Sequence, residues 1–536
     1  MQIVLISIMR KLRHFFSLEA DQKIAKRYLS RGRYATSSGV ILVEANQPAW
    51  NQLALSLFLP KACLRFDAHP VNYYLQRDSL IIRFKESIRQ RFSVSHFYGI
   101  SRFYVIGSGS RLFKKQRLLA ETLAKSFTSK AEFEAFEYKG IRIGDLVYDQ
   151  YLRAAKNPTL HFQDPLFVLK LAEAISFVDS LLALFDFHNV KAVCVSHTVY
   201  ALAIPVRVAI KRNIPAFQVN GEQIYRLSAT NSHAFTEFKS YSKEFQTISP
   251  YVRREGLELA KDRLQRRFSG EIGVDMPYSS ASAYLQHKDN LFQLPKKQMV
   301  TILVAVHDFF DSPHSYGDNL FPDFMEWLDF LGKISVETNY DWFLKTHPDV
   351  VGDGDEILRN FVKRFPKFMI IPKEVSHHTL LSQGINVVLT IFGTIASEYA
   401  YLGKLAVNAS VNNPHISYNF CLNPKSTEEF GNILLELEKL VTSFKPNQEE
   451  ILEFYFMHHF NRLKSWIFSD LPSALQELGG YSGMLSWKVI KYYFEGSNHF
   501  KSIDIESALE NYLVSEDYNL SRKHFPDFSE ARKILP

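Results

Sequence analysis

Short apolar runs rich in β-branched residues, separated by stretches long enough for a helix, constrain this 536-residue chain most. Four of the runs precede residue 220 and five follow residue 298. Parallel β-α-β units have this pattern, because each strand needs a crossover helix before its parallel neighbour. The sequence therefore predicts two α/β domains containing the strands Gly39–Val43, Ser101–Ile106, Val190–Ser196, Ile214–Val219, Met299–Val306, Tyr340–Leu344, Phe368–Ile371, Val387–Ile391 and Leu405–Asn408.

The segment 229–298 separates the two blocks of strands and carries few strand signals of its own. Within it, 275–294 is rich in turn-forming residues and is typical of an interdomain connection. Helical periodicity predicts helices over Lys114–Lys130, Pro165–Phe187 and Arg253–Arg267. The fold class expected is α/β with two Rossmann-like domains facing a cleft, and we divide the chain into a first domain (1–290), a second domain (291–440) and a C-terminal helical segment that packs back across both (441–536).

Composition excludes several classes of protein. Hydrophobic residues make up 46% of the chain and charged residues 22%, which are values of a globular protein. The net charge of +7 is small for this length, and no nucleic-acid-binding motif is present, so no nucleic-acid partner is expected. The three cysteines are far apart in the sequence, which favours a reducing, cytoplasmic compartment.

The first 35 residues are basic and contain interleaved Phe and Leu side chains. Such a segment can lie on an anionic membrane surface, on the inner face of a membrane for a cytoplasmic protein. The alternative, a helix with a solvated charged face, is equally compatible with the pattern.

Two polar motifs follow predicted strands of the second block. Lys345-Thr-His-Pro348 ends one strand, and its lysine and imidazole (His347) can both donate to phosphate oxygens. The run from Gly393 to Glu398 ends another. Because ligands of open α/β sheets lie at the carboxyl ends of the strands, these ends predict a nucleotide site.

Each residue of the second motif has a chemical reason to be there. Gly393 lets the backbone approach a ligand closely, and Thr394 can cap the next helix, whose free N–H groups then face an anion. Ser397 adds a hydroxyl, and Glu398 can accept from a ribose diol. An ordinary strand–turn–helix with a capping box is the alternative.

The first strand of the second block ends in a loop with two histidines and two aspartates, which are His307, Asp308, Asp311 and His314. These side chains can supply acid–base groups or donors to the sugar and phosphate. A metal site is the alternative, but the ligand spacing is not diagnostic, so we expect a cleft without metal.

Candidates for the catalytic base on the first-domain side are Glu222 and Asp67, with Asp308 and Asp311 as further candidates. Ser196 and His197 also end a predicted strand and are expected to face the same cleft.

A family resemblance follows from four runs, which are Val304–His314, Trp342–Pro348, Thr390–Glu398 and Leu402–Lys404. They resemble the bacterial capsule polysaccharide biosynthesis glycosyltransferases, a group similar to the capsule Kdo-transferases. The resemblance covers roughly residues 299–425 and leaves the acceptor side open.

The resemblance implies a GT-B fold, a nucleotide-sugar donor linked to CMP or UDP, no obligatory metal and no other cofactor. It places His347, Pro348, Ser397 and Glu398 on the nucleotide, with Gly393 and Thr394 beside the phosphate. The expected acceptor is a growing surface polysaccharide or a lipid-linked glycan. Two other functions remain open, a sugar-nucleotide 2-epimerase and a non-catalytic polysaccharide-binding protein of capsule export.

Overall fold

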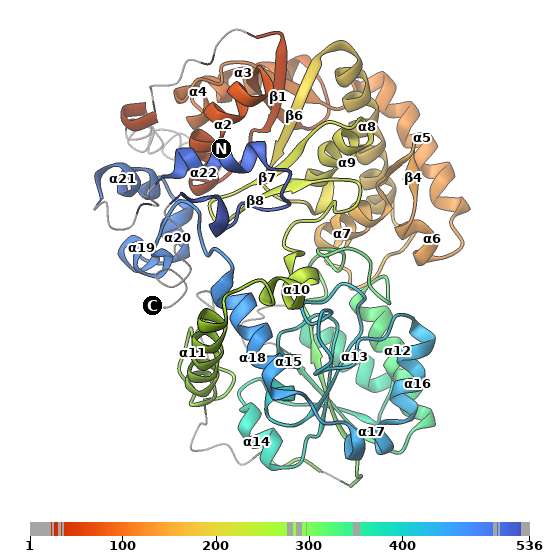
Figure 1. Ribbon diagram of the computed structural model, residues 1–536. Coiled ribbons are helices and arrows are strands. Elements are labelled where there is room, and N and C mark those ends of the chain that lie inside the picture. Colours follow the sequence, from red (N-terminus) through yellow and green to blue (C-terminus); the bar gives the residue numbers. More distant parts are fainter. Residues whose placement is uncertain are drawn as a thin grey trace, which may run out of the picture.

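The computed structural model describes residues 23, 26–29, 34, 37–275, 282–285, 292–295, 297–346, 354–496, 501 and 504–526. Two α/β domains, each built on its own sheet, lie one above the other (Figure 1). The expected fold class, two Rossmann-like domains with C-terminal helices, is confirmed.

The sheet of the first domain has six strands in the order β3-β2-β1-β6-β7-β8. All neighbours are parallel except β7 and β8, which form an antiparallel pair. A separate two-stranded hairpin joins β4 (Glu137–Tyr138) to β5 (Ile141–Arg142). The strands of the main sheet are β1 (Gly39–Glu44), β2 (Ala68–Leu75), β3 (Phe103–Ile106), β6 (Asn189–Val195), β7 (Ala216–Val219) and β8 (Ile224–Leu227).

The sheet of the second domain has five parallel strands in the order β11-β10-β9-β12-β13. In both sheets the first strand in sequence is central, and the chain builds outward from it first to one side and then to the other. The strands are β9 (Thr301–Val306), β10 (Asp341–Thr346), β11 (Phe368–Ile370), β12 (Val387–Thr390) and β13 (Leu405–Asn408).

Helices cover both faces of each sheet, because the parallel strands carry apolar side chains on both faces and each face must be shielded from water. On the first sheet, one face packs against α2 and the C-terminal helices, and the other against α5, α7, α8 and α9. The helices of this domain are α2 (Ala49–Phe66), α3 (Leu80–Arg91), α4 (Val94–Phe97), α5 (Ser110–Ser126), α6 (Lys130–Glu134), α7 (Gly144–Ala155), α8 (Pro165–Phe187), the 3-10 helix η1 (Tyr200–Ala203) and α9 (Ile204–Lys211).

The second sheet has one face against α10, α11, α14, α15 and α18, and the other against α12, α13, α16 and α17. These helices are η2 (Glu237–Ser240), α10 (Tyr241–Phe245), α11 (Pro250–Phe268), α12 (Phe324–Glu337), α13 (Gly354–Arg364), α14 (His377–Ser382), α15 (Ile395–Tyr401), α16 (Thr427–Leu435), α17 (Leu437–Ser443) and α18 (Gln448–Phe456).

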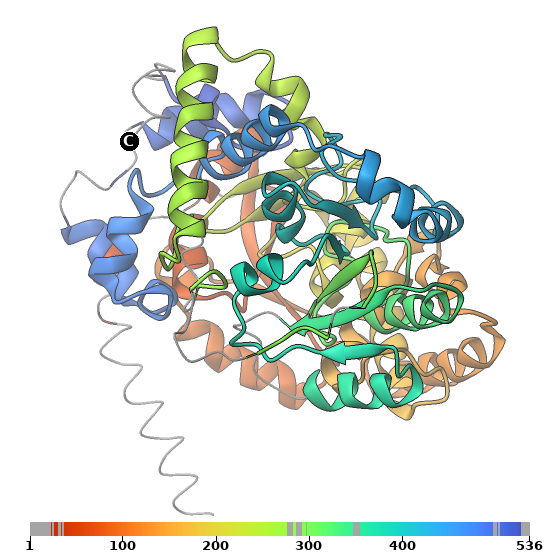
Figure 2. The same cartoon turned by 90° about the horizontal axis from the view of Figure 1, so that it is seen from below.

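Within the described residues, the chain crosses between the domains twice. Residues 238–264 pack into the core of the second domain, where α11 lies against α18. After the π-helical turn η3 (Met457–Asn461) the chain returns, and the blue C-terminal helices lie beside α2 of the first domain (Figures 1 and 2). The returning helices are α19 (Leu471–Leu478), α20 (Tyr481–Leu485), α21 (Lys488–Glu495), α22 (Ile505–Val514) and the 3-10 turn η5 (Arg522–His524).

All nine predicted strands are present, but β2, β8 and the two short strands of the β4–β5 hairpin are absent from the predictions. Pro70 is a main reason for missing β2, because proline removes a backbone donor and argues against a central strand. In the structure Pro70 pairs with Ile41 inside the sheet. The predicted helix Lys114–Lys130 begins and ends four residues earlier, and Pro165–Phe187 is observed with the predicted bounds.

Candidate functional site

The candidate site lies where the strand order of each sheet reverses. The connections that follow the two strands at this point run to opposite faces of the sheet. The two loops at the carboxyl ends of these strands therefore diverge and leave a crevice between them. In the first sheet this point lies between β1 and β6, and in the second between β9 and β12. Each switch point carries its own cluster of polar side chains.

At the first switch point, Glu44 at the end of β1 is joined to Ser196, which directly follows β6. One carboxylate oxygen of Glu44 accepts from both the backbone N–H and the hydroxyl of Ser196, each at 2.8 Å. Burial raises the pKa of Glu44 to about 6, because the cost of desolvation outweighs the two hydrogen bonds from Ser196, which lower the pKa. Glu44 is therefore a buried carboxylate that titrates near neutrality.

His197 extends this chain of hydrogen bonds toward solvent. Its Nδ1 lies 3.0 Å from the hydroxyl oxygen of Ser196, and its side chain is exposed. Because the single hydroxyl proton of Ser196 is donated to Glu44, the serine oxygen must accept from Nδ1–H, which leaves Nε2 unprotonated. The surrounding protein lowers the pKa of His197 below 6.5 by partial desolvation, and nearby Glu222 opposes this. A neutral imidazole with a free Nε2 is the form of a general base.

A short bridge connects the two switch points. The hydroxyl of Tyr200, three residues after His197, donates to Asp311 of the β9–α12 loop at 3.1 Å. Arg153 of α7 donates to the same hydroxyl at 2.9 Å and lies over the tyrosine ring. Tyr200 has φ = +57°, a conformation that non-glycine residues rarely adopt and that recurs at functional sites. The loop carrying His197 thus faces the loop carrying Asp308 and Asp311.

The second switch point is formed by the ends of β9 and β12. Nε2 of His307 lies 3.1 Å from the hydroxyl of Thr390, and the N–H of Gly393 donates to that same hydroxyl at 3.2 Å. The ring of His307 packs against Phe324 and Phe392. A Cβ on Gly393 would come within 2.7 Å of the Thr390 hydroxyl, so the tight turn after β12 requires glycine here.

The remaining donor-side candidates are turned toward other parts of the protein. Lys345 is buried and its ammonium donates to the carbonyl of Lys373 at 2.7 Å; desolvation lowers its pKa to about 8. Thr394 is the N-cap of α15, but its hydroxyl makes no capping hydrogen bond, so the expected cap is wrong. The hydroxyl of Ser397 donates to the Thr394 carbonyl at 2.7 Å. His347 and Pro348 lie outside the described residues.

Glu398 has both carboxylate oxygens engaged. One accepts from Arg267 of α11 at 2.9 Å, and the other accepts from the hydroxyl of Tyr284 at 2.7 Å. The Glu398 side chain is 7% exposed, so its ion pair with Arg267 ties α15 to α11 in the interior of the second domain.

The candidates of the first domain divide between the two edges of its sheet. Asp67 ends α2 and directly precedes β2, so it lies at the amino edge, opposite the switch point. Glu222 lies in the turn between β7 and β8 and acts electrostatically on His197. Asp308 is exposed in the loop after β9 and accepts from the N–H of Phe310.

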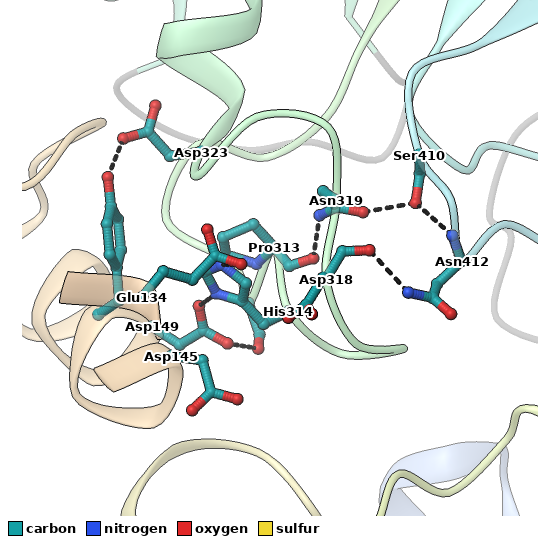
Figure 3. Close-up of polar contacts among 12 residues, drawn as sticks. Glu134, Asp145, Asp149, Pro313, His314, Asp318, Asn319, Asp323, Ser410 and Asn412 are labelled. Carbon is teal, nitrogen blue, oxygen red and sulfur yellow. Dashed lines mark hydrogen bonds and ion pairs between the residues drawn. The ribbon is translucent and has the colours of Figure 1, made fainter. Parts of the chain in front are cut away.

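His314 is buried where the loop after β9 meets α7 of the first domain (Figure 3). Its Nδ1 donates to Asp149 of α7 at 2.5 Å, and Nε2 lies 3.5 Å from Glu134. Burial alone would lower the pKa of His314, but the two carboxylates outweigh it and raise the pKa well above 6.5. Further pairs, such as Arg142–Asp318, attach the same loop to the first domain.

A cavity of about 490 Å³ opens beside the first switch point. Its walls come from the end of β2 and from α7, α8 and η1. The lining is apolar at Leu75, Val147, Phe177 and Leu202, and polar groups enter from Gln76, Arg77, Lys170 and Glu173. The 3-10 helix η1 starts three residues after His197, so this cavity and the imidazole share one loop.

Sequence reasoning missed Glu44 as a site residue. A signal existed, because Glu44 directly follows the first predicted strand, and the first strand is central in a doubly wound sheet. Within the described ranges, no group of three or more His, Cys, Asp or Glu side chains is arranged to hold a metal ion. No helix in the described part of the chain is long and apolar enough to cross a membrane.

Comparison with known proteins gives structural likeness only. No protein-family model matches the chain, and no curated protein matches it. Solved structures that resemble it include UDP-GlcNAc 2-epimerase from Neisseria meningitidis bound to UDP-GlcNAc, with 12% identity, a TM-score of 0.24 and coverage of 78% of this chain and 98% of that chain. A glycosyltransferase from Rickettsia africae matches with 8% identity, a TM-score of 0.21 and coverage of 86% and 100%. A Streptomyces glycosyltransferase matches with 9% identity, a TM-score of 0.18 and coverage of 78% and 96%.

Proposed function

We propose that this chain is a cytoplasmic glycosyltransferase that moves a sugar from a CMP- or UDP-linked donor to a hydroxyl of a surface polysaccharide or lipid-linked glycan. The observation that carries the proposal is the facing pair of switch points, one of which holds His197 as a neutral base through Ser196 and Glu44. Two sheets that present their carboxyl edges to one another suit a reaction between two bound substrates.

The proposed chemistry uses His197 as the base. Its Nε2 takes the proton of the acceptor hydroxyl while the acceptor oxygen forms a bond to the anomeric carbon of the donor. The bond from that carbon to the phosphate oxygen breaks, and its electron pair leaves with the nucleotide phosphate. Glu44 stabilises the imidazolium that forms, as a carboxylate behind a catalytic histidine does.

In this proposal the donor lies at the second switch point, against His307, Gly393 and Thr394, with His347 and Pro348 completing the contact. Lys345, Ser397 and Glu398 position the surrounding loops through the hydrogen bonds described above. Glu222, Asp308 and Asp311 border the reacting groups. Asp67, at the opposite edge of the sheet, has no part in it.

The donor side is tested by calorimetry with CMP, CDP, UDP and GDP. We expect one of them to bind, and Gly393→Val to weaken that binding at least tenfold, because the new Cβ displaces the turn at Thr390. Gly109→Val is the matched control, since the nearest atom to its Cβ lies 3.9 Å away and it is in the other domain. If all four nucleotides fail to bind, the proposed function is lost and the glycan-binding alternative is favoured.

The acceptor side is proposed to be the cavity beside His197, whose apolar walls and polar donors suit a sugar ring. Leu202→Trp fills this cavity and is expected to raise the KM for acceptor at least tenfold without changing nucleotide affinity. Leu118→Trp, at an exposed position of α5, is the control. Acceptor kinetics measured at saturating donor distinguish the two.

The epimerase alternative is decided by incubating the donor without acceptor. Formation of the 2-epimer would replace the transferase proposal, whereas inert donor or slow hydrolysis supports it. An epimerase has no acceptor substrate, so Leu202→Trp would then have no acceptor KM to raise. Both the incubation without acceptor and the Leu202→Trp kinetics therefore distinguish an epimerase from a transferase.

A further inference from the structure

Helix α3 is amphipathic, but its polar face is turned toward the protein and its apolar face toward solvent. It buries the polar side chains of Glu86 and Gln90. It exposes large apolar side chains at 85%, 81%, 69% and 39% of their surface, which are Leu80, Ile81, Phe84 and Ile88. These four residues, the α3 patch, share one face at helical spacing. A contiguous apolar face on an ordered helix marks an interaction surface.

The orientation of α3 is fixed by its polar side. The amide of Gln90 donates to the carbonyl of Ile100 at 2.6 Å and accepts from the side chain of Asn72 at 2.9 Å. Ser79 caps the first turn by accepting from the N–H of Ile82. The helix cannot roll to bury the α3 patch without breaking these bonds, so the exposed face belongs to the folded state.

Exposed cations surround the α3 patch. The helix carries four basic residues, all exposed, and its single acid is the buried Glu86; the four are Arg83, Lys85, Arg89 and Arg91. Arg83 pairs with Asp78 at 2.5 Å. The guanidinium of Arg77 lies 4.4 Å from the ring centre of Phe113, so the segment that leads into α3 lies against the first turn of α5. That end of α5 adds exposed Arg111, Lys114, Lys115 and Arg117.

We propose that the α3 patch docks on an anionic membrane surface. Leu80, Ile81 and Phe84 enter the boundary between headgroups and acyl chains, while the flanking Arg and Lys side chains meet lipid phosphates. The charges favour this occupant over a second copy of the chain, because a symmetric contact would place the same cations against one another.

The docking surface goes beyond the proposed function and does not depend on it. It does have a consequence for that function, because Arg77 lines the cavity beside His197 and is two residues before Ser79, the N-cap of α3. A membrane held against α3 would therefore lie next to the proposed acceptor cavity, where a lipid-linked acceptor is presented.

The test is co-sedimentation of the full chain with vesicles of phosphatidylcholine alone and with an equal part of phosphatidylglycerol. We expect binding to the anionic vesicles only, and a loss of at least tenfold in the double variant Ile81→Ser, Phe84→Ser. The matched control is Leu64→Ser, Phe187→Ser, because these side chains are 78% and 86% exposed at the opposite edge of the first sheet. Added salt should weaken wild-type binding, since each Lys or Arg at the surface contributes about fivefold.

Four outcomes overturn the proposal. Equal binding to neutral vesicles removes the role of the cations. Equal losses in the test and control variants remove the role of the α3 patch. Binding that survives Ile81→Ser, Phe84→Ser but disappears when residues 1–22 are deleted assigns membrane contact to the basic N-terminus instead. Concentration-dependent self-association relieved by the test variant, without vesicle binding, assigns the patch to a second copy.

Discussion

Replacing His197 with alanine is expected to lower the rate of sugar transfer by about 10²- to 10⁴-fold and to leave nucleotide affinity unchanged. The imidazole is exposed, its Nδ1 is held by Ser196, and its pKa is lowered, so at neutral pH it is a ready proton acceptor. Rates at saturating substrates and calorimetry with the nucleotide measure the two effects separately. A variant that transfers sugar at the wild-type rate would exclude His197 as the base.

His161→Ala is the control for this experiment. That histidine is also exposed and in the first domain, but it precedes α8 and belongs to neither switch point. We expect its transfer rate to stay within about twofold of wild type, as for a surface substitution away from the site. Equal losses in both variants would indicate a general effect of removing an exposed imidazole.

Glu44→Gln separates the base from its support. The folded-state pKa of Glu44 is raised from 4.5 to about 6, so its contribution to stability is complete below 4.5 and is lost as pH rises through 6. Glutamine cannot ionise, so at neutral pH the free energy of unfolding of the variant is expected to be about 2 kcal/mol higher than that of wild type. Transfer should nevertheless fall, because glutamine cannot stabilise the imidazolium of His197. A purely structural glutamate would not give opposite changes in stability and rate.

The fold was largely predictable because its main signal is local. Each of the nine predicted strands is a short apolar run, and apolar runs flanked by helix-length segments require a sheet covered on both faces. β2 was not predicted because it contains Pro70, and proline argues against a strand inside a sheet. Only the observed pairing of β2 with β1 and β3 shows that this position accepts a proline.

The site was predictable only in part, because its contacts join distant parts of the chain. Glu44 and Ser196 are 152 positions apart, and their bond exists only because β1 and β6 are neighbours. Lys345 was expected to face phosphate from its place at a strand end. Sequence does not tell which way a side chain points from the last residues of a strand, and its ammonium points to the carbonyls of Pro372 and Lys373.

His314→Ala is expected to lower the free energy of unfolding by about 3–5 kcal/mol, because it leaves a buried acid without its cation. Asp149 is 1% exposed, and besides His314 it accepts a hydrogen bond from the hydroxyl of Ser312. Combining His314→Ala with Asp149→Ala should cost less than the sum of the two single changes, since the double variant has no uncompensated charge. Additive losses would show that the pair is not coupled.

The pH dependence of this loss distinguishes an ion pair from simple packing. The folded-state pKa of His314 is raised above 6.5, so its contribution is complete below pH 6.5 and is lost as pH rises through the folded-state pKa. His415 is the matched buried histidine, 0% exposed, with a pKa that burial lowers to about 3. Its contribution is present above pH 6.5 and is lost as pH falls.

Scanning calorimetry at about pH 6 and about pH 9 therefore gives opposite trends for the two variants. The difference in unfolding temperature between wild type and His314→Ala should narrow at the higher pH, and that for His415→Ala should not. Because the joint at His314 attaches the loop that carries Asp308 and Asp311 to α7, its loss should also loosen the approach of the two switch points. Transfer by His314→Ala is then expected to weaken below its unfolding temperature, and a variant that is unstable but fully active would confine His314 to stability alone.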